Sequence, residues 1–285
     1  MTPENRTGKV SILRADSRDR HGAIPALRHL SNEVWRFRGQ IWTVYKQNFR
    51  NLYQGSGLGV FWNFILPLVP LTVYLFLSKI RVFPNFEGVD GATYITFGVT
   101  VWFVLTGFIN LPISIVQSRN QAAMRTSLPL SASIASGFAG LLFETLVRLV
   151  FITALIIATR NWPALTAPGV ILLIGPAFFL FFGTGLILGV LNVIYKDVAR
   201  ITKILLQYGL FVSGVIFPLG ASKWSVLTGI YNPLAVFVHA FRQIVFQGRI
   251  DSLIPLAVWS AMGLVIFALG CRLFYVMEYR IRGIN

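Results

Sequence analysis

The chain has 285 residues, of which 55% are hydrophobic and 12% charged, and its mean hydropathy of +0.68 lies outside the range of soluble globular proteins. Four long windows contain no charged residue: 51–78, 91–118, 161–195 and 252–271. A membrane-spanning helix needs about 20 mostly apolar residues, and in lipid the backbone must satisfy its own hydrogen bonds. The sequence therefore predicts an all-α integral membrane protein.

The charged residues argue against several other classes of protein. The ten acidic residues are scattered, whereas a membrane enzyme with metal or acid–base chemistry would cluster its carboxylates. The three histidines have no metal-ligand spacing, and the single Cys271 ends an apolar run as a small hydrophobic side chain would. The formal net charge of +15 invites a nucleic-acid partner, but the basic residues flank the apolar windows, which indicates membrane topology and contact with anionic lipid.

The N-terminal region divides into two parts. Residues 1–31 are polar, rich in Arg and Ser, and lack an apolar segment of the kind a signal peptide has, so we expect a disordered tail. In 33–53, apolar and aromatic residues from Val34 to Leu52 form one helical stripe, and the basic residues lie mostly off it. With Trp35 and Trp42 at the head-group level, this pattern predicts an amphipathic interface helix in the membrane plane. The alternative is an extension of the first span.

Six spans are predicted in the membrane domain, which covers residues 32–285: 57–78, 92–113, 131–158, 168–194, 202–220 and 253–274. Ten Lys and Arg residues precede the first span, and the loops after the second and fourth spans are also basic. The positive-inside rule then predicts that both termini are cytoplasmic, which agrees with an even number of spans.

One charged pair lies inside a predicted span. Glu144 and Arg148 are four residues apart in the third span, so they share one helix face, in the order that favours an ion pair. Because an ionised group is costly in lipid, we expect the pair to face protein or water. Two readings stay open: a polar patch on a substrate path or subunit interface, or a structural pair that holds helices together.

Residues 222–248 are too polar to cross a membrane cleanly and too aromatic for an ordinary loop. Pro218, Gly220 and the Asn232–Pro233 step interrupt helices here. We expect two short re-entrant helices that enter the periplasmic leaflet and turn back before the last span. Such backbone is tolerated where it is buried in protein or lines a cavity.

Four short sequence motifs occur in this order along the chain: 53–62 followed by Pro67, 120–129, 192–198 (Asn-Val-Ile-Tyr-Lys-Asp-Val) and 231–234 (Tyr-Asn-Pro-Leu). Together they resemble the membrane subunits of type-2 ATP-binding-cassette exporters of polysaccharides, which include O-antigen, capsule and teichoic-acid permeases. The resemblance covers about residues 33–280. Lys196 stands where this family more often has Arg, so a bidentate contact at that position is not implied.

The resemblance implies a homodimer with the transport path between two copies, and a separate ATPase subunit that binds ATP and Mg. The chain itself contains no G-x-x-x-x-G-K-[ST] phosphate loop. Residues 117–128 are then expected to form a short cytoplasmic helix that docks on the ATPase, with Arg119, Asn120 and Arg125 as contacts. Lys196 and Asp197 are expected at the cytoplasmic gate, although Asp197 is also placed to cap the following helix.

The leading hypothesis is export of a lipid-linked polysaccharide, O-antigen-like or capsular, across a bacterial inner membrane. Aromatic faces stack on sugar rings, so the residues expected to line the periplasmic exit are Trp224, Tyr231, Asn232, Phe237 and Phe241. The alternative for these aromatics is an interfacial belt. The alternative functions are a drug or small-molecule exporter of the same superfamily and, from another class, a membrane-embedded enzyme acting on lipid-linked glycans.

Overall fold

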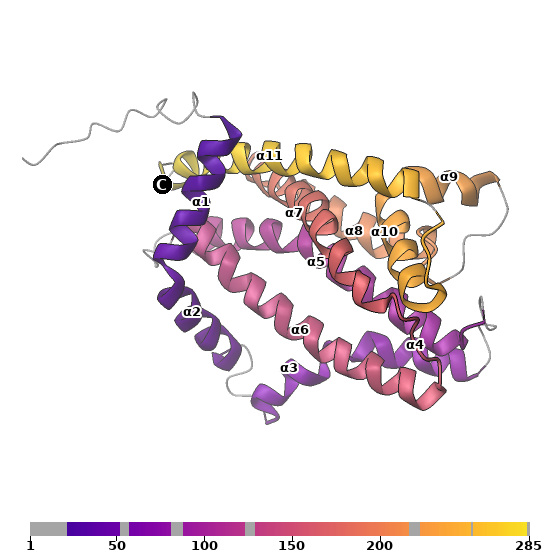
Figure 1. Ribbon diagram of the computed structural model, residues 1–285. Coiled ribbons are helices and arrows are strands. Elements are labelled where there is room, and N and C mark those ends of the chain that lie inside the picture. The colour runs from indigo at the N-terminus through magenta and orange to yellow at the C-terminus, as the bar shows by residue number, and fades with distance from the viewer. Residues whose placement is uncertain are drawn as a thin grey trace, which may run out of the picture.

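A computed structural model describes residues 22–51, 57–80, 88–122, 129–216, 223–251 and 253–283. All regular elements within these ranges are helices, which confirms the all-α fold. Figure 1 shows a bundle of long helices running in roughly one direction, with α1 and the C-terminus at one end and α9 at the other. We call these the α1 end and the α9 end.

Four helices are long and apolar enough to cross a membrane: α5 (Gly91–Ala122), α6 (Leu130–Thr159), α7 (Val170–Ile194) and α11 (Leu253–Gly283). They coincide with the second, third, fourth and last predicted spans. α7 packs against both α5 and α11. Glycine permits these close contacts: a Cβ at Gly185 of α7 would lie 2.6 Å from the carbonyl oxygen of Ile109 in α5. Helices in membranes use small residues in this way to bring their backbones together.

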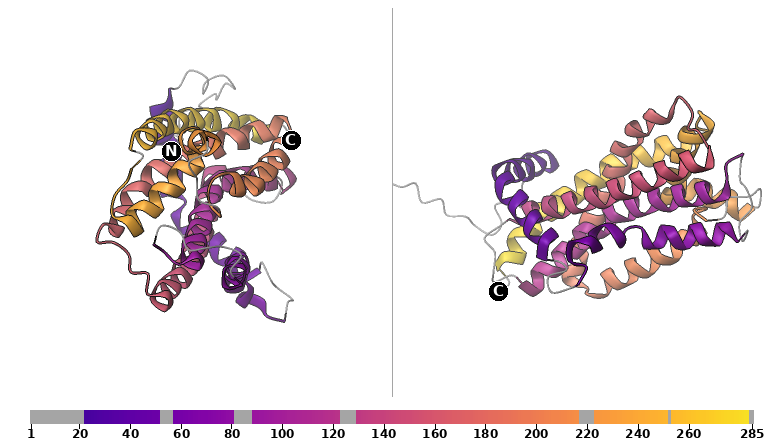
Figure 2. Two further views of the ribbon diagram at one scale, coloured as in Figure 1. Left: turned by 90° about the vertical axis from the view of Figure 1, so that its right-hand side faces the viewer. Right: turned by 90° about the horizontal axis from the view of Figure 1, so that it is seen from below.

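The first predicted span, 57–78, is not one continuous helix. It consists of a short 3-10 turn (η2, Gly59–Phe61), α3 (Trp62–Ile65) and α4 (Val69–Lys79), with a turn at 66–68 between the two helices (Figure 2). Pro67 and Pro70 explain the interruption, because proline has no N–H to donate along a helix and its ring clashes with the preceding turn. The structure therefore corrects the expectation of an unbroken helix here.

The fifth predicted span also differs from expectation. α8 (Asp197–Val212) begins five residues before the predicted start at 202 and ends before Ser213. Its 16 residues extend about 24 Å, which is less than the roughly 30 Å of a bilayer core. The helix ends where Gly214 adopts a φ of 69°, a left-handed conformation that glycine tolerates best. The described part of the chain thus contains four span-length helices, with α4 and α8 shorter.

The N-terminal helices begin earlier than the sequence predicted. Residues 23–31 of α1 (Ala23–Arg36) were expected to belong to a disordered tail, and α2 (Arg38–Asn51) follows after a break at Phe37. α1 is ordered because it packs against α11 and α6, with Leu27 and Leu30 on an apolar cluster that includes Phe274. The expected single interface helix over 33–53 is therefore two helices, and residues 1–21 lie outside the described part.

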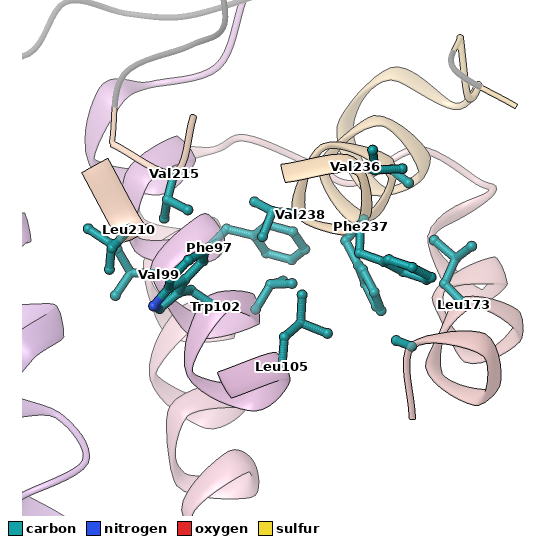
Figure 3. Packing of buried hydrophobic residues seen from close by; sticks show 14 of the residues in the cluster. Phe97, Val99, Trp102, Leu105, Leu173, Leu210, Val215, Val236, Phe237 and Val238 are labelled. Atoms are coloured by element: carbon teal, nitrogen blue, oxygen red, sulfur yellow. The ribbon is translucent and has the colours of Figure 1, made fainter. Parts of the chain in front are cut away.

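Before the last long helix, the chain forms α9 (Lys223–Tyr231), α10 (Pro233–Arg242) and a π-helical turn (η4, Gln243–Gln247). Two short helices divided at Asn232–Pro233 were predicted, and both are present: α9 ends at Tyr231 and α10 begins at Pro233. α10 packs against α5, α7 and α11. Figure 3 shows Phe237 and Val238 of α10 within a cluster that includes Phe97 and Leu105 of α5.

Candidate functional site

A pocket of about 290 Å³ lies between α2, the bend that joins α3 to α4, and α6. We call it the α2–α6 pocket. Its walls combine aromatic rings, amides, a hydroxyl and an ion pair: Tyr45, Asn48, Phe49, Asn63, Leu66, Pro67, Ser136, Gly137, Gly140, Phe143, Glu144 and Arg148. The break at 66–68 helps to form the pocket, because Leu66 and Pro67 line it.

The predicted Glu144–Arg148 pair is present in this pocket. Arg148 Nη2 donates a 3.1 Å hydrogen bond to Glu144 Oε2. The two side chains differ in exposure, since that of Arg148 is 7% exposed and that of Glu144 is 49% exposed. The guanidinium also lies over the Phe103 ring of α5, 5.0 Å from its centroid. Arg148 thus connects α6 to α5, while the half-exposed Glu144 carboxylate lines the pocket.

Buried polar atoms at the pocket retain hydrogen-bonding capacity. Among the described residues, Arg148 Nε and Nη1 and Ser136 Oγ are buried without a hydrogen-bond partner. In contrast, the Asn63 side-chain amide donates a 3.0 Å hydrogen bond to the Phe49 carbonyl oxygen, which connects α3 to α2. Native proteins rarely leave buried polar atoms unmatched, and such atoms often mark a site for a ligand or water.

The aromatic side of the pocket is a connected set of rings. Phe49 meets Phe143 edge-on at 4.9 Å between centroids, and Phe143 meets Phe64 at 5.1 Å. Tyr45 stacks on Trp42 at 5.3 Å, and Trp42 is 54% exposed. Burial raises the pKa of the Tyr45 hydroxyl. The pocket therefore offers both ring faces and hydrogen-bonding groups.

A second polar cluster lies at the α1 end, where three helices meet. The N-terminus of α6 follows Pro129, whose side chain makes no capping hydrogen bond. Instead, Glu278 Oε1 of α11 accepts from Leu130 N at 2.9 Å, and Glu33 Oε2 of α1 accepts from Ser131 Oγ at 2.7 Å. Carboxylates are favoured at a helix N-terminus because they satisfy free N–H groups and meet the positive end of the helix dipole.

The predicted gate residues lie at the same end and are exposed. Lys196 precedes α8, and Asp197 forms an ion pair with Arg200 of its own helix at 3.3 Å. The capping role considered for Asp197 is filled by Asn192, whose Oδ1 accepts from Ala199 N at 3.0 Å. Asn192 is buried in the last turn of α7, so it fixes the corner between α7 and α8.

The residues expected at the exit have different environments. Tyr231 is exposed, whereas Phe237 and Phe241 are buried. Phe237 packs edge-on against Phe181 of α7. These two phenylalanines are therefore core residues of a single chain and do not line a path. The side chain of Trp224 lies outside the described residues.

Asn232 has a structural role that the sequence only partly indicated. Its Oδ1 accepts from Leu234 N at 3.0 Å and from Ala235 N at 3.4 Å, so it caps α10. Its amide nitrogen donates to Ser213 Oγ at 2.8 Å, which links α10 to the end of α8. Asn is a favoured N-cap residue, and Pro233 at the first helical position is compatible with this start.

Arg242 is a second buried cation, and it lies in the segment 222–248 that the sequence analysis described only as too polar to cross a membrane. It is 2% exposed and donates to the carbonyl oxygens of Gly214, at 2.8 Å, and Tyr94, at 3.1 Å, and also to that of Val215. Its guanidinium lies 3.8 Å from the centroid of the Tyr94 ring. An arginine within the mainly apolar stretch 233–246 was the signal that could have identified this junction.

The predicted ATPase contacts fall mostly outside the described part of the structure. Arg125 lies in the segment 123–128, which is not described, and the side chains of Arg119 and Asn120 are not described either. The backbone of α5 continues without interruption to Ala122. Residues 117–122 therefore extend a long helix instead of beginning a separate short one.

Comparison with known proteins agrees with this architecture. The sequence matches the ABC-2 type transporter family over residues 39–246. It is 23% identical over 251 residues to an O-antigen export system permease protein, RfbA of Myxococcus xanthus, a match that covers 86% of this chain and 95% of that protein. It is 21% identical over 240 residues to a polysialic acid transport protein, KpsM of Escherichia coli, covering 82% of this chain and 92% of that protein.

The long apolar helices and the family match together define a multi-pass membrane protein that serves as the membrane subunit of a transporter. The chain belongs to the ABC-2 type transporter family.

Proposed function

We propose that this chain is the permease subunit of an ATP-driven exporter that moves a lipid-linked polysaccharide across the inner membrane of a bacterium. The observation that carries the proposal is similarity along nearly the whole length of an O-antigen export permease and a polysialic acid transport protein. In this proposal two copies form the transport path, and a separate ATPase supplies the energy.

The proposed membrane arrangement has both termini in the cytoplasm and six spans. The bent segment from α3 to α4 and the short α8 serve as the first and fifth spans, and α9 and α10 re-enter the periplasmic leaflet. The α1 end is then cytoplasmic. Trp35 and Trp42 support this arrangement, because both are exposed on α1 and α2, with Arg38 and Lys46 over their rings. Exposed aromatic and basic residues are typical of helices at the head-group level.

The function is tested by reconstituting the chain with its ATPase in liposomes and measuring ATP hydrolysis. A lipid-linked glycan should stimulate hydrolysis, and deletion of the chain should remove the polysaccharide from the cell surface. Stimulation by hydrophobic drugs but not by the glycan would favour a drug exporter. Product formation by the chain without an ATPase would favour an enzyme.

The proposed ATPase contact at residues 117–128 is tested by Arg125→Glu. We expect this change to lower export at least about tenfold while leaving the amount of protein in the membrane unchanged, because reversing a contact charge weakens docking. The measurements are surface polysaccharide, membrane level, and ATP hydrolysis by the purified complex. Normal export by this variant would reject the contact.

A further inference from the structure

We propose that the α2–α6 pocket binds a sugar residue of the lipid-linked substrate, a hypothesis that rests on the proposed function. The pocket lies apart from the residues suggested for the periplasmic exit, and it includes the Glu144–Arg148 pair that the sequence allowed as a polar patch on a substrate path. The hydrogen-bonding atoms and the ring faces on its walls carry the argument.

The polar groups of the pocket match a hydroxyl-rich ligand. Asn48 contributes an amide, Ser136 a hydroxyl, and Glu144 a half-exposed carboxylate. Arg148 is more than nine-tenths buried and has nitrogens without partners among the described residues. Sugar hydroxyls both donate and accept, so they can bond to the exposed Asn48 amide and to the half-exposed Glu144 carboxylate, which the Arg148 guanidinium holds in place.

The aromatic groups suit the apolar face of a sugar ring. Tyr45, Phe49 and Phe143 line the same pocket as the polar groups, and the ring contacts around Phe49 hold this wall together. A site with a few placed polar groups and aromatic walls is typical of small-molecule recognition. The volume of about 290 Å³ is at the lower limit of ligand pockets and suits a small unit of a polymer.

Two other occupants suit the pocket less well. An acyl chain would cover the half-exposed Glu144 carboxylate without offering it a hydrogen bond, which is costly. A phosphate would place its negative charge beside the Glu144 carboxylate, which already pairs with the Arg148 guanidinium at 3.1 Å. A neutral ring with hydroxyl groups meets neither penalty.

The location is suited to a substrate that carries a lipid. The pocket joins α2, which lies at the proposed membrane surface, to the middle of α6. A sugar attached to a membrane lipid can therefore reach it while the lipid stays in the bilayer.

The test places a photo-crosslinking amino acid, p-benzoylphenylalanine, at Asn48 of the full chain in cells that also contain the ATPase. Gln47, the preceding residue of α2, is exposed and does not line the pocket, so the same change there is the matched control. The cells either make the polysaccharide or lack the glycosyltransferase that adds its first sugar. After illumination, the purified chain is stained for carbohydrate and analysed for lipid adducts.

We expect carbohydrate on the chain from the Asn48 position in cells that make the polysaccharide, and none from cells without the glycan or from the Gln47 position. Failure of the wild-type chain to export polysaccharide would reject the proposed function together with the sugar site. If the wild-type chain exports but Asn48 gives no carbohydrate adduct, or gives the same phospholipid adduct in both strains, the sugar site alone is rejected.

A second variant fills the pocket without disturbing the fold. A Cβ at Gly140 would meet no atom within 4 Å, so Gly140→Leu projects a side chain into the pocket. Leucine is also a better helix former than glycine, which protects α6. We expect at least about a tenfold loss of the carbohydrate adduct at Asn48 and slower export.

The matched control is Gly175→Leu in α7, which also meets no atom within 4 Å and lies outside the pocket. It should leave both the adduct and export unchanged. An unchanged adduct and unchanged export in Gly140→Leu, at equal protein level, would overturn the proposal.

Discussion

Within α6, Arg148 is buried whereas its partner Glu144 is half exposed. Removing one side chain should therefore affect stability differently from removing the other. Glu144→Ala leaves a buried guanidinium without its carboxylate, whereas Arg148→Ala leaves a carboxylate that still reaches the pocket. We expect Glu144→Ala to cost about 1.5–3 kcal/mol, because hydrogen bonds to charged groups contribute about this much and the stranded charge stays buried.

The measurement is the Tm of the purified chain in detergent for the two single variants and the double variant. The double variant should lose less stability than the sum of the two single variants, since no charge is stranded. Strictly additive losses would show that the two residues do not interact.

At the corner between α7 and α8, mutations can separate the capping role of Asn192 from the ion pair of Asp197. Asn192→Ala removes the acceptor for Ala199 N and should cost about 0.5–2 kcal/mol, the usual value of a helix cap. Asp197→Ala removes an exposed ion pair with Arg200 and should cost at most about 1 kcal/mol. A larger drop in Tm for Asp197→Ala than for Asn192→Ala would contradict this assignment.

Export by Asp197→Asn then addresses the proposed gate. Because the cap belongs to Asn192, loss of the Asp197 charge should leave the fold intact. If the variant reaches normal membrane levels and fails to export, the carboxylate has a role in transport. If it exports normally, Asp197 is a solvated end residue and the gate hypothesis is wrong.

At the scale of elements, Arg242 fastens α10 to the end of α8 and to the first turns of α5. Gly98 makes room for it, because a Cβ at this position would overlap the guanidinium. Gly98→Ala should therefore displace Arg242 from the carbonyl oxygens of Gly214 and Tyr94 and lower stability by about 1–3 kcal/mol, as overpacking does.

The control for this variant is Gly140→Ala in α6, where an added Cβ meets open space. Its stability should rise slightly, because alanine is the better helix former. The check is the Tm of both variants in the same detergent. A Tm for Gly98→Ala equal to or above that of the wild type would show that α5 and α10 adjust easily at this junction.

At the scale of the whole molecule, the proposed arrangement predicts the side on which each end lies. A reporter fused after Asn285 should be cytoplasmic, and one inserted near Glu87 should be periplasmic, because the basic segments follow the positive-inside rule. Enzymatic reporters that are active on one side of the membrane measure this. A periplasmic C-terminus would reject the six-span arrangement.

Several elements were predictable because their signals are local. Long windows without charge identify α5, α7 and α11, and α6 lies in an apolar run that only Glu144 and Arg148 interrupt, since lipid requires continuous apolar helices. The Glu144–Arg148 pair follows from a spacing of four residues on one helix. The division at Asn232 follows from the chemistry of an Asn–Pro step.

The burial of individual aromatic residues and the helix at residues 23–31 could not be predicted from the hydrophobic pattern of the sequence. An apolar stripe has the same appearance whether it faces lipid or protein, so the sequence did not separate the buried Phe237 and Phe241 from exposed aromatics such as Tyr231. The order of residues 23–31 depends on packing of α1 against α11 and α6, which a composition-based prediction of disorder does not include.

The amino-acid composition of each segment is enough to predict a helical membrane protein and the positions of its long helices, because the apolar content of a segment decides whether it can be buried in lipid. Composition does not predict which polar groups meet. Glu278 reaches Leu130 N across 148 residues, and Asn48 and Arg148 line one pocket from α2 and α6. These contacts depend on how the helices pack against one another, and packing of this kind is not encoded in the periodicity of any single segment.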